Sequence, residues 1–277
     1  MDKLEFITVE PKVDLHIRDW GSGKAVVFLP GWPLGHEMFE YQFNQLPQLG
    51  YRCVGITQRG FGKSSKPWGE YTYDVFAQDL KQVLETLDLK EVTLVGHSMG
   101  GAVALNFVAK NMSERVSKLV LVGAATPSFI RRPGFPQGLG SRDVDDLMEL
   151  CEKDRAQLNE NFGKIFFKNE DTVSKKMAEW YFSMGMEASP QATLACLATL
   201  RDTDLRGALS RVNIPTLVFH SPQDKICPFA LGQATVAGIK GARMVEFENS
   251  GHGLFYEEKE KFNQELIAFV NEGPPHG

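Results

Sequence analysis

One serine lies in a turn that could make it a nucleophile. The pentapeptide Gly96-His97-Ser98-Met99-Gly100 separates the strand-like run 92–95 from the helix-forming run 101–109. A serine at so sharp a strand-to-helix turn takes a strained backbone conformation, and side chains two positions before and after it would collide. The glycines therefore predict that Ser98 is held at the tip of the turn. Because five residues alone are a weak pattern, the prediction depends on the flanking strand and helix.

A serine hydroxyl needs a base to accept its proton and an acid to orient that base. Among the six histidines, we predict His252 as the base, because it lies between glycines in a loop before the last expected helix. This loop also follows the expected last strand. The other histidines are assigned elsewhere: His97 must point away from the turn, His16 lies on a wetter hairpin strand, His220 lies in a core strand, His36 begins a helix and His276 lies in the tail.

The acid is expected after a strand that lies between Ser98 and His252 in the chain. Asp224 follows the apolar run 214–219, at the carboxyl end of a strand, where open α/β sheets bind their ligands. Asp202 and Asp204 are the alternatives, but they precede that strand and are better placed to pair with neighbouring arginines. Ser98, Asp224 and His252 are therefore the predicted catalytic residues.

A tetrahedral intermediate also needs N–H donors for its oxyanion. The amide of Met99 follows the nucleophile at a helix N-terminus. A second donor is expected from the loop that begins at Gly31, where Pro33 has no N–H to give. Trp32 or a near neighbour is therefore the predicted second donor, unless this loop is only a turn.

The elements that must position these residues alternate along the chain. Residues 4–10 and 13–20 alternate apolar and polar side chains, as antiparallel strands with one wet face do, whereas 25–30 is apolar throughout. From there strands and helices follow one another, which is typical of a parallel sheet covered by helices on both faces. Residues 127–210 interrupt this order with a mainly helical insertion, expected as a cap within one domain spanning 1–277.

The bulk composition is ordinary for a soluble globular protein. Of 277 residues 43% are hydrophobic, and the net charge of −5 excludes a basic surface for nucleic acid. The four cysteines are widely spaced and show no metal-binding pattern. No apolar run is long enough to span a bilayer, and the N-terminus lacks the features of a signal peptide. We expect a cytoplasmic protein without membrane or nucleic-acid partners. A homo-oligomer is compatible with this expectation.

Five stretches together carry a family resemblance: 28–42, 58–68, 92–105, 215–229 and 250–255. They resemble the α/β-hydrolase superfamily, in particular its aryl esterases, γ-lactamases and cofactor-free haloperoxidases, which are perhydrolases. The resemblance implies an eight-stranded sheet with a helical cap, and it matches Ser98, Asp224 and His252 to the family's triad. Trp32 and Met99 match its oxyanion-hole positions. The chain departs from the pattern at Thr57, where relatives usually have an aspartate two residues before Arg-Gly.

The expected activity is hydrolysis of small carboxylic esters or lactones, without metal or organic cofactor. Trp32-Pro33 resembles the loop of the perhydrolases, which implies perhydrolysis as a side activity. The alternatives are a γ-lactamase or C–C bond hydrolase with the same triad, or a small-ligand receptor of the same fold. Aromatic side chains of the insertion are expected to line an apolar acyl or aryl pocket without a fixed charge.

Overall fold

The computed structural model describes residues 4–112 and 114–273, and within them eight strands form a single sheet. The strand order is β1-β2-β4-β3-β5-β6-β7-β8. The strands are β1 (Phe6–Glu10), β2 (Val13–Gly21), β3 (Lys24–Leu29), β4 (Tyr51–Ile56), β5 (Val92–His97), β6 (Val116–Val122), β7 (Thr216–His220) and β8 (Arg243–Glu246). Strand β2 runs antiparallel to both β1 and β4, and the pairs from β4 to β8 are parallel. The expected mostly parallel, eight-stranded sheet is confirmed.

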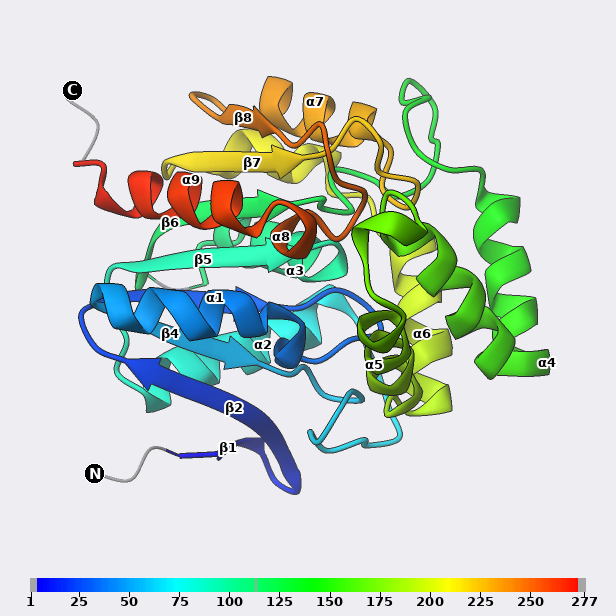
Figure 1. Ribbon diagram of the computed structural model, residues 1–277, viewed down its shortest axis with the longest axis horizontal. Coiled ribbons are helices and arrows are strands. Elements are labelled where there is room, and N and C mark those ends of the chain that lie inside the picture. Colours follow the sequence, from blue (N-terminus) through cyan, green and yellow to red (C-terminus); the bar gives the residue numbers. More distant parts are fainter. Residues whose placement is uncertain (1–3, 113, 274–277) are drawn as a thin grey trace.

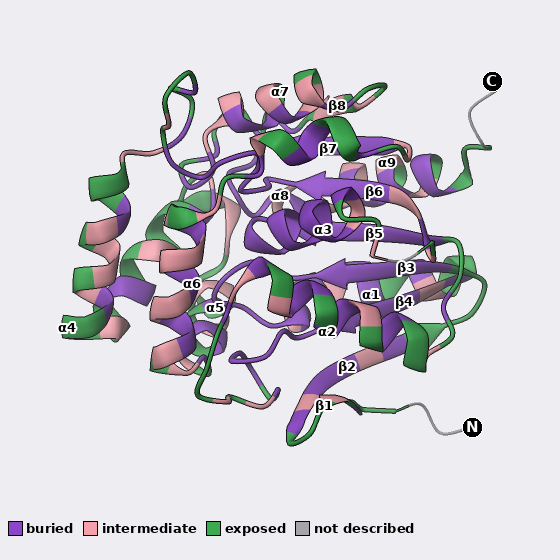
Figure 2. Ribbon diagram, turned by 180° about the vertical axis from the view of Figure 1, so that it is seen from behind, coloured by how far each residue is buried: buried purple, intermediate pink, exposed green. Residues whose placement is uncertain are grey.

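Burial follows the hydrophobic pattern of each strand. Every residue of β5 is buried, and β3 is buried after its first residue. Both strands lie at the centre of the sheet, and Figure 2 shows them buried beneath the surrounding helices. By contrast β1 and β8, at the two edges, are partly exposed. The uninterrupted apolar runs therefore mark strands covered on both faces.

Helices cover both faces of this sheet (Figure 1). Helices α1 (Glu40–Gln45) and α9 (Lys259–Asn271) lie on one face, and α2 (Tyr73–Thr86) and α3 (Met99–Ala109) lie on the other. Threonine caps the start of α2, because the Thr72 hydroxyl accepts a hydrogen bond from Val75 N at 3.3 Å. The sheet is also accompanied by η1 (His36–Phe39), η2 (Leu46–Leu49), η4 (Arg206–Arg211), α7 (Phe229–Gly238) and α8 (Leu254–Glu257).

The insertion between β6 and β7 contains α4 (Ser141–Phe166), η3 (Glu170–Thr172), α5 (Lys175–Met186) and α6 (Pro190–Asp202). These helices lie beyond the carboxyl ends of the parallel strands, at the right of Figure 1. Residues 127–140, whose sequence is rich in Gly and Pro turn signals, form no helix and only isolated bridges such as Ile130–Leu139. Helix α4 is interrupted at Asp154, whose carboxylate accepts from Gln157 N at 2.9 Å and so caps the second half.

The helices and the cysteines bear on two expectations from the sequence. Across the described ranges, no helix is long and apolar enough to cross a membrane. The four cysteines are buried. The tail residue His276 and residues 1–3, 113, 274, 275 and 277 lie outside the described residues.

Candidate active site

Ser98 lies in a strained turn between β5 and α3. Its φ of 53° and ψ of −119° are a conformation that a non-glycine residue rarely adopts. A Cβ atom on Gly96 would lie 2.5 Å from the carbonyl oxygen of Gly100, and one on Gly100 would lie 2.5 Å from that of Pro30. The glycines thus permit the turn sterically, for the reason that the sequence suggested.

Asp224 and His252 form a buried hydrogen-bonded pair. Nδ1 of His252 lies 2.7 Å from Oδ2 of Asp224, and neither side chain is exposed. Asp224 follows β7, and His252 lies in the loop after β8, so two neighbouring parallel strands bring them together. Nε2 of His252 is buried and has no hydrogen-bond partner within the described residues. This nitrogen is therefore available to a neighbouring group.

Backbone amides and histidines surround the carboxylate of Asp224. Its Oδ1 accepts from the amides of Ile226 at 2.8 Å and Cys227 at 2.9 Å. Burial alone would raise the pKa of Asp224, but the charge of His252 and its hydrogen bond, together with His220 and the Ile226 amide, outweigh burial and lower it. Asp224 is therefore ionised at neutral pH and can orient the imidazole.

Ser98 lies against the same group of residues. Its Oγ is 4.0 Å from Sγ of Cys227, the residue whose amide binds Asp224. The neighbouring His97 ring lies 4.4 Å, centroid to centroid, from that of His252, and its Nε2 is 3.0 Å from the His252 carbonyl oxygen. The structure therefore brings Ser98, Asp224 and His252 into one buried region at the carboxyl edge of the sheet.

The loop after β3 reaches the serine from the other side. A Cβ on Gly31 would lie 2.9 Å from Cβ of Ser98, so only glycine allows this approach. Within the described residues, the amides of Trp32 and Met99 donate no turn or loop hydrogen bond to a backbone carbonyl. The indole of Trp32 is held by a hydrogen bond from Nε1 to the carbonyl oxygen of Thr193, at 3.1 Å. Helix α6 thereby fixes this loop to the insertion.

An apolar cavity of about 130 Å³ opens onto Ser98. Trp32 and Ser98 line one side, and Phe129, Leu139, Leu147, Leu158, Phe162, Ile165, Leu197, Leu200 and Ile226 supply most of the remainder. Two polar side chains, Asn161 and Lys225, also line it. The insertion therefore supplies much of an apolar pocket over the serine, and the charged residue among its described lining, Lys225, is exposed and donates from Nζ to the carbonyl oxygen of Lys168.

The comparisons with known proteins identify the family. The family model described as "alpha/beta hydrolase fold" matches residues 24–259. This chain belongs to the α/β-hydrolase family. The AB hydrolase superfamily protein YisY of Bacillus subtilis is 44% identical over 266 residues, which cover 96% of this chain and 98% of that protein. The fold and the family resemblance suggested by the sequence are thus confirmed.

Two further relatives carry names that describe an activity. The chain is 34% identical to the non-heme chloroperoxidase CPO-A1 of Kitasatospora aureofaciens, over 95% of this chain and 98% of that protein. A solved esterase, EaEST from Exiguobacterium antarcticum, is 40% identical and superposes with a TM-score of 0.91, over 94% of this chain and 96% of that chain. This chain is an enzyme of the α/β-hydrolase family with esterase and haloperoxidase relatives.

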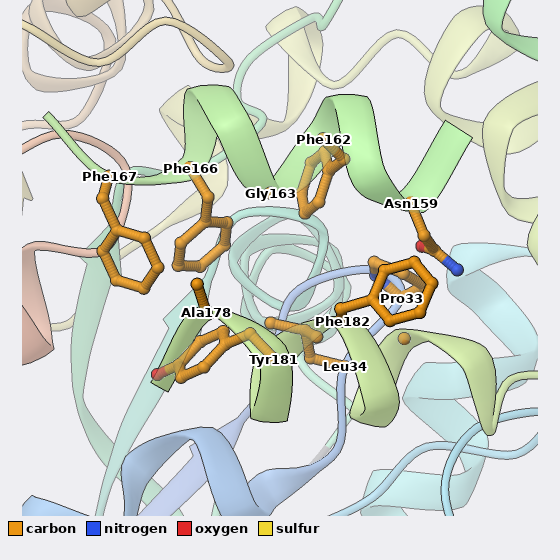
Figure 3. Close-up of a pocket in the computed structure, with 11 residues that line it drawn as sticks. Pro33, Leu34, Asn159, Phe162, Gly163, Phe166, Phe167, Ala178, Tyr181 and Phe182 are labelled. Atoms are coloured by element: carbon orange, nitrogen blue, oxygen red, sulfur yellow. The ribbon is translucent and has the colours of Figure 1, made fainter. Parts of the chain in front are cut away.

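In this α/β-hydrolase a second, smaller cavity lies beside the loop (Figure 3). It has a volume of about 20 Å³, and Pro33, Leu34, Phe166, Phe167, Tyr181 and Phe182 are among its lining residues. Figure 3 shows these aromatic rings gathered from α4, α5 and the segment between them. Of the aromatic residues of the insertion, Phe129 lines the cavity at Ser98, Phe162 lines both cavities, and the others named here line the cavity at Pro33 and Leu34.

Sequence reasoning missed three contributors to the hydrolase site. A Cβ on Gly123, which has a φ of 47°, would lie 3.1 Å from Oδ2 of Asp224 and 3.3 Å from Nδ1 of His252. His220, assigned to the core, is buried but also lies 3.5 Å from Asp224. Cys227 contacts Ser98 and binds Asp224 through its amide. Gly123 was detectable as the glycine that ends an apolar strand, whereas nothing local marks Cys227.

Proposed function

We propose that this hydrolase is a serine esterase that cleaves small carboxylic esters or lactones through an acyl-enzyme. The observation that carries the proposal is the buried Asp224–His252 pair, whose free Nε2 lies in the same region as the strained Ser98. Ser98 is the nucleophile, His252 the base and Asp224 the residue that orients it. The esterase relative supports this class of substrate.

Each proton and bond has a place in this reaction. Oγ of Ser98 attacks the carbonyl carbon while Nε2 of His252 takes its proton, and the carbonyl oxygen becomes an oxyanion. The N–H groups of Trp32 and Met99 bind that oxyanion. The intermediate collapses as His252 returns the proton to the leaving alcohol. Water, activated by the same imidazole, then releases the acid and restores Ser98.

The insertion acts as the cap of the site in this proposal. Its side chains, from Phe129 to Leu200, line most of the apolar cavity above Ser98. Such a lining removes water from the acyl group and strengthens the hydrogen bonds to the oxyanion. The cavity therefore favours a short acyl or aryl group over a long, polar one.

Perhydrolysis is the second activity that we propose, and the loop at Pro33 favours it. Hydrogen peroxide would replace water in the second step, so the acyl group leaves as a peracid and Ser98 is restored. The fixed φ of Pro33 helps to place the carbonyl group of Trp32. The haloperoxidase relative supports this reaction.

Turnover of p-nitrophenyl acetate and labelling by a fluorophosphonate test the proposal directly. The wild-type enzyme should turn over many times and be labelled at Ser98, and Ser98→Ala should abolish both. Labelling without steady-state turnover would instead indicate a receptor. A panel of esters, lactones, lactams, C–C substrates and peroxide with acetate then ranks the reactions, and Pro33→Leu should lower peroxide use relative to ester hydrolysis.

A further inference from the structure

A second group of histidines and a carboxylate lies outside the Ser98 region. His16 belongs to β2, and His36 and Glu37 begin η1, immediately after the Trp32 loop. One nitrogen of each histidine and one carboxylate oxygen of Glu37 all lie within 4.8 Å of one another. Both histidines are buried, so the expectation that His16 lies on a wetter strand is wrong.

Three polar atoms of this group have no hydrogen bond. They are Nδ1 of His16, Nε2 of His36 and Oε2 of Glu37, each of which is buried and unpaired within the part of the chain that the structure describes. Buried polar atoms without partners destabilise a fold. The two unpaired nitrogens both lie near Oε1 of Glu37, which indicates that another group satisfies them.

The spacing of the atoms fits a metal ion better than direct hydrogen bonds. Oε1 of Glu37 lies 3.3 Å from Nδ1 of His16 and 3.8 Å from Nε2 of His36. Good N–H···O bonds are shorter, whereas two ligands of a tetrahedral zinc ion lie roughly 3.4 Å apart when each bond is about 2.1 Å. A small shift of these side chains would close them around one ion.

The outward-facing nitrogen of His36 has a hydrogen-bond partner of the kind found around metal ligands, whereas that of His16 lies beyond hydrogen-bond distance of Glu5. Nδ1 of His36 lies 2.8 Å from Oγ1 of Thr57, and Nε2 of His16 lies 3.7 Å from a carboxylate oxygen of Glu5. When a histidine donates its outer N–H to such a partner, the lone pair of its other nitrogen points at the metal. Thr57, which replaces the usual aspartate, thus acquires a role in orienting His36.

Two glycines make room for the group. A Cβ on Gly55 of β4 would lie 2.8 Å from Cβ of His36, and one on Gly35 would lie 2.3 Å from Oε2 of Glu37. The His16 and His36 rings lie 4.7 Å apart, centroid to centroid. The backbone on both sides therefore accommodates this arrangement of side chains.

We propose that His16, His36 and Glu37 bind one Zn²⁺ ion, with water as a fourth ligand. Two imidazoles and one carboxylate are a donor set that zinc accepts in tetrahedral geometry. The ion would tie β2 to the start of η1 and so hold the segment that follows the Trp32-Pro33 loop. It takes no part in bond cleavage at Ser98. Positions 16 and 36 are widely separated and match no metal-binding motif, so no sequence pattern predicts this site.

Zinc titration of the full chain without an affinity tag tests the proposal, because a histidine tag would itself bind zinc. After removal of metal by a chelator and of the chelator by dialysis, calorimetry with ZnCl₂ should show one site per chain. The melting temperature should rise by about 5 °C when free zinc exceeds the dissociation constant a hundredfold. CoCl₂ should give the intense visible absorption of four-coordinate cobalt.

Variants locate the ion. His16→Gln and Glu37→Gln should each weaken zinc binding by more than about tenfold, whereas Glu40→Gln, the same change in a neighbouring carboxylate, should not. Circular dichroism and gel filtration establish that each variant is folded. If folded wild-type protein binds no zinc, or if the His16 and Glu37 variants bind it as the wild type does, the proposal is wrong. In the first case a proton shared by His16 and Glu37 is the alternative.

Discussion

The molecule contains two groups of histidine and carboxylate side chains, and they differ first in the distance between nitrogen and oxygen. Asp224 and His252 lie 2.7 Å apart, and two backbone amides complete the carboxylate's hydrogen bonds. Glu37 lies 3.3 Å and 3.8 Å from its two histidines, and three polar atoms of that group are unpaired within the described residues. The first distance suits a shared proton, and the second leaves space for an ion.

The partners of each histidine ring decide what its unpaired nitrogen can do. In the Asp224 pair one ring nitrogen is hydrogen-bonded, and the other is unpaired within the described residues and could accept the proton of Ser98 in the proposed reaction. In the Glu37 group the outer nitrogen of His36 is hydrogen-bonded to Thr57, and the inner nitrogens of both histidines lie near the Glu37 carboxylate. Similar residue types thus support proton transfer in one place and metal binding in the other, because the second partner of each ring differs.

Asp224→Asn should give the largest effect and separate the two groups. An amide in place of the carboxylate favours the wrong tautomer of His252, so kcat for p-nitrophenyl acetate should fall by about 10⁴. Zinc binding should be unchanged, since Asp224 is not among the proposed ligands. Steady-state kinetics and calorimetry on the same preparation measure both.

Asp202→Asn is the matched control, because Asp202 is the alternative acid in the sequence. Asp202 pairs with Arg201 at 2.8 Å at the end of α6. Its replacement should leave kcat close to that of the wild type. A loss in Asp202→Asn comparable with that in Asp224→Asn would contradict the assignment of the acid.

Gly123→Ala should disturb the Asp224 pair more gently. The added methyl group would lie 3.1 Å from Oδ2 of Asp224, and the neighbouring atoms must move by a few tenths of an ångström. Small displacements of catalytic groups are expensive, so we expect kcat to fall by about 10². Gly134→Ala is the control, since Gly134 also has a positive φ but nothing within 4 Å of the added atom. Equal kinetics for the two variants would show that Gly123 matters only for its backbone.

Most of the sheet could be predicted from the sequence, because a strand that is buried on both faces has an uninterrupted run of apolar residues. The apolar runs of β3 and β5 need no knowledge of distant partners, and the glycines around Ser98 report a local collision. Chain order then leads to Asp224 and His252. Each of these features can be inferred from residues that are close in sequence or from the order of residues along the chain.

The remaining features depend on contacts between distant segments. Cys227 reaches Ser98 only because β5 and β7 both end at the same edge. His16 and His36 meet because β2 pairs with β4, and Gly55 of β4 leaves space for His36. Pairing in space, rather than residue type, decides these positions.

His97→Gln should make the enzyme less sensitive to acid. Burial lowers the pKa of His97 well below its ordinary value, and nearby His252 and His220 lower it further. As pH falls through the ordinary histidine range, the unfolded chain binds a proton that the folded chain does not, so the free energy of unfolding falls by up to about 1.4 kcal/mol per pH unit. The variant lacks this contribution.

Urea unfolding of both proteins at pH 8 and at pH 5.5 measures the difference. The comparison at pH 8 reports the packing change alone, because His97 is then neutral in both states. The wild type should lose more stability than the variant between the two conditions. Parallel losses would mean that His97 is not kept neutral by burial.

Lys225→Gln should give the smallest effect, and it tests whether the cavity prefers negatively charged substrates. Lys225 lines the cavity at Ser98, and its Nζ donates to the carbonyl oxygen of Lys168 at 3.0 Å. A partly solvated ammonium attracts a substrate carboxylate weakly, so kcat/KM for an ester with a free carboxylate should fall a few-fold while that for a neutral ester stays the same. Raising the salt concentration should reduce the same preference in the wild type. Equal changes for both esters would mean that Lys225 shapes the cavity without recognising charge, and the apolar residues alone would then select the substrate.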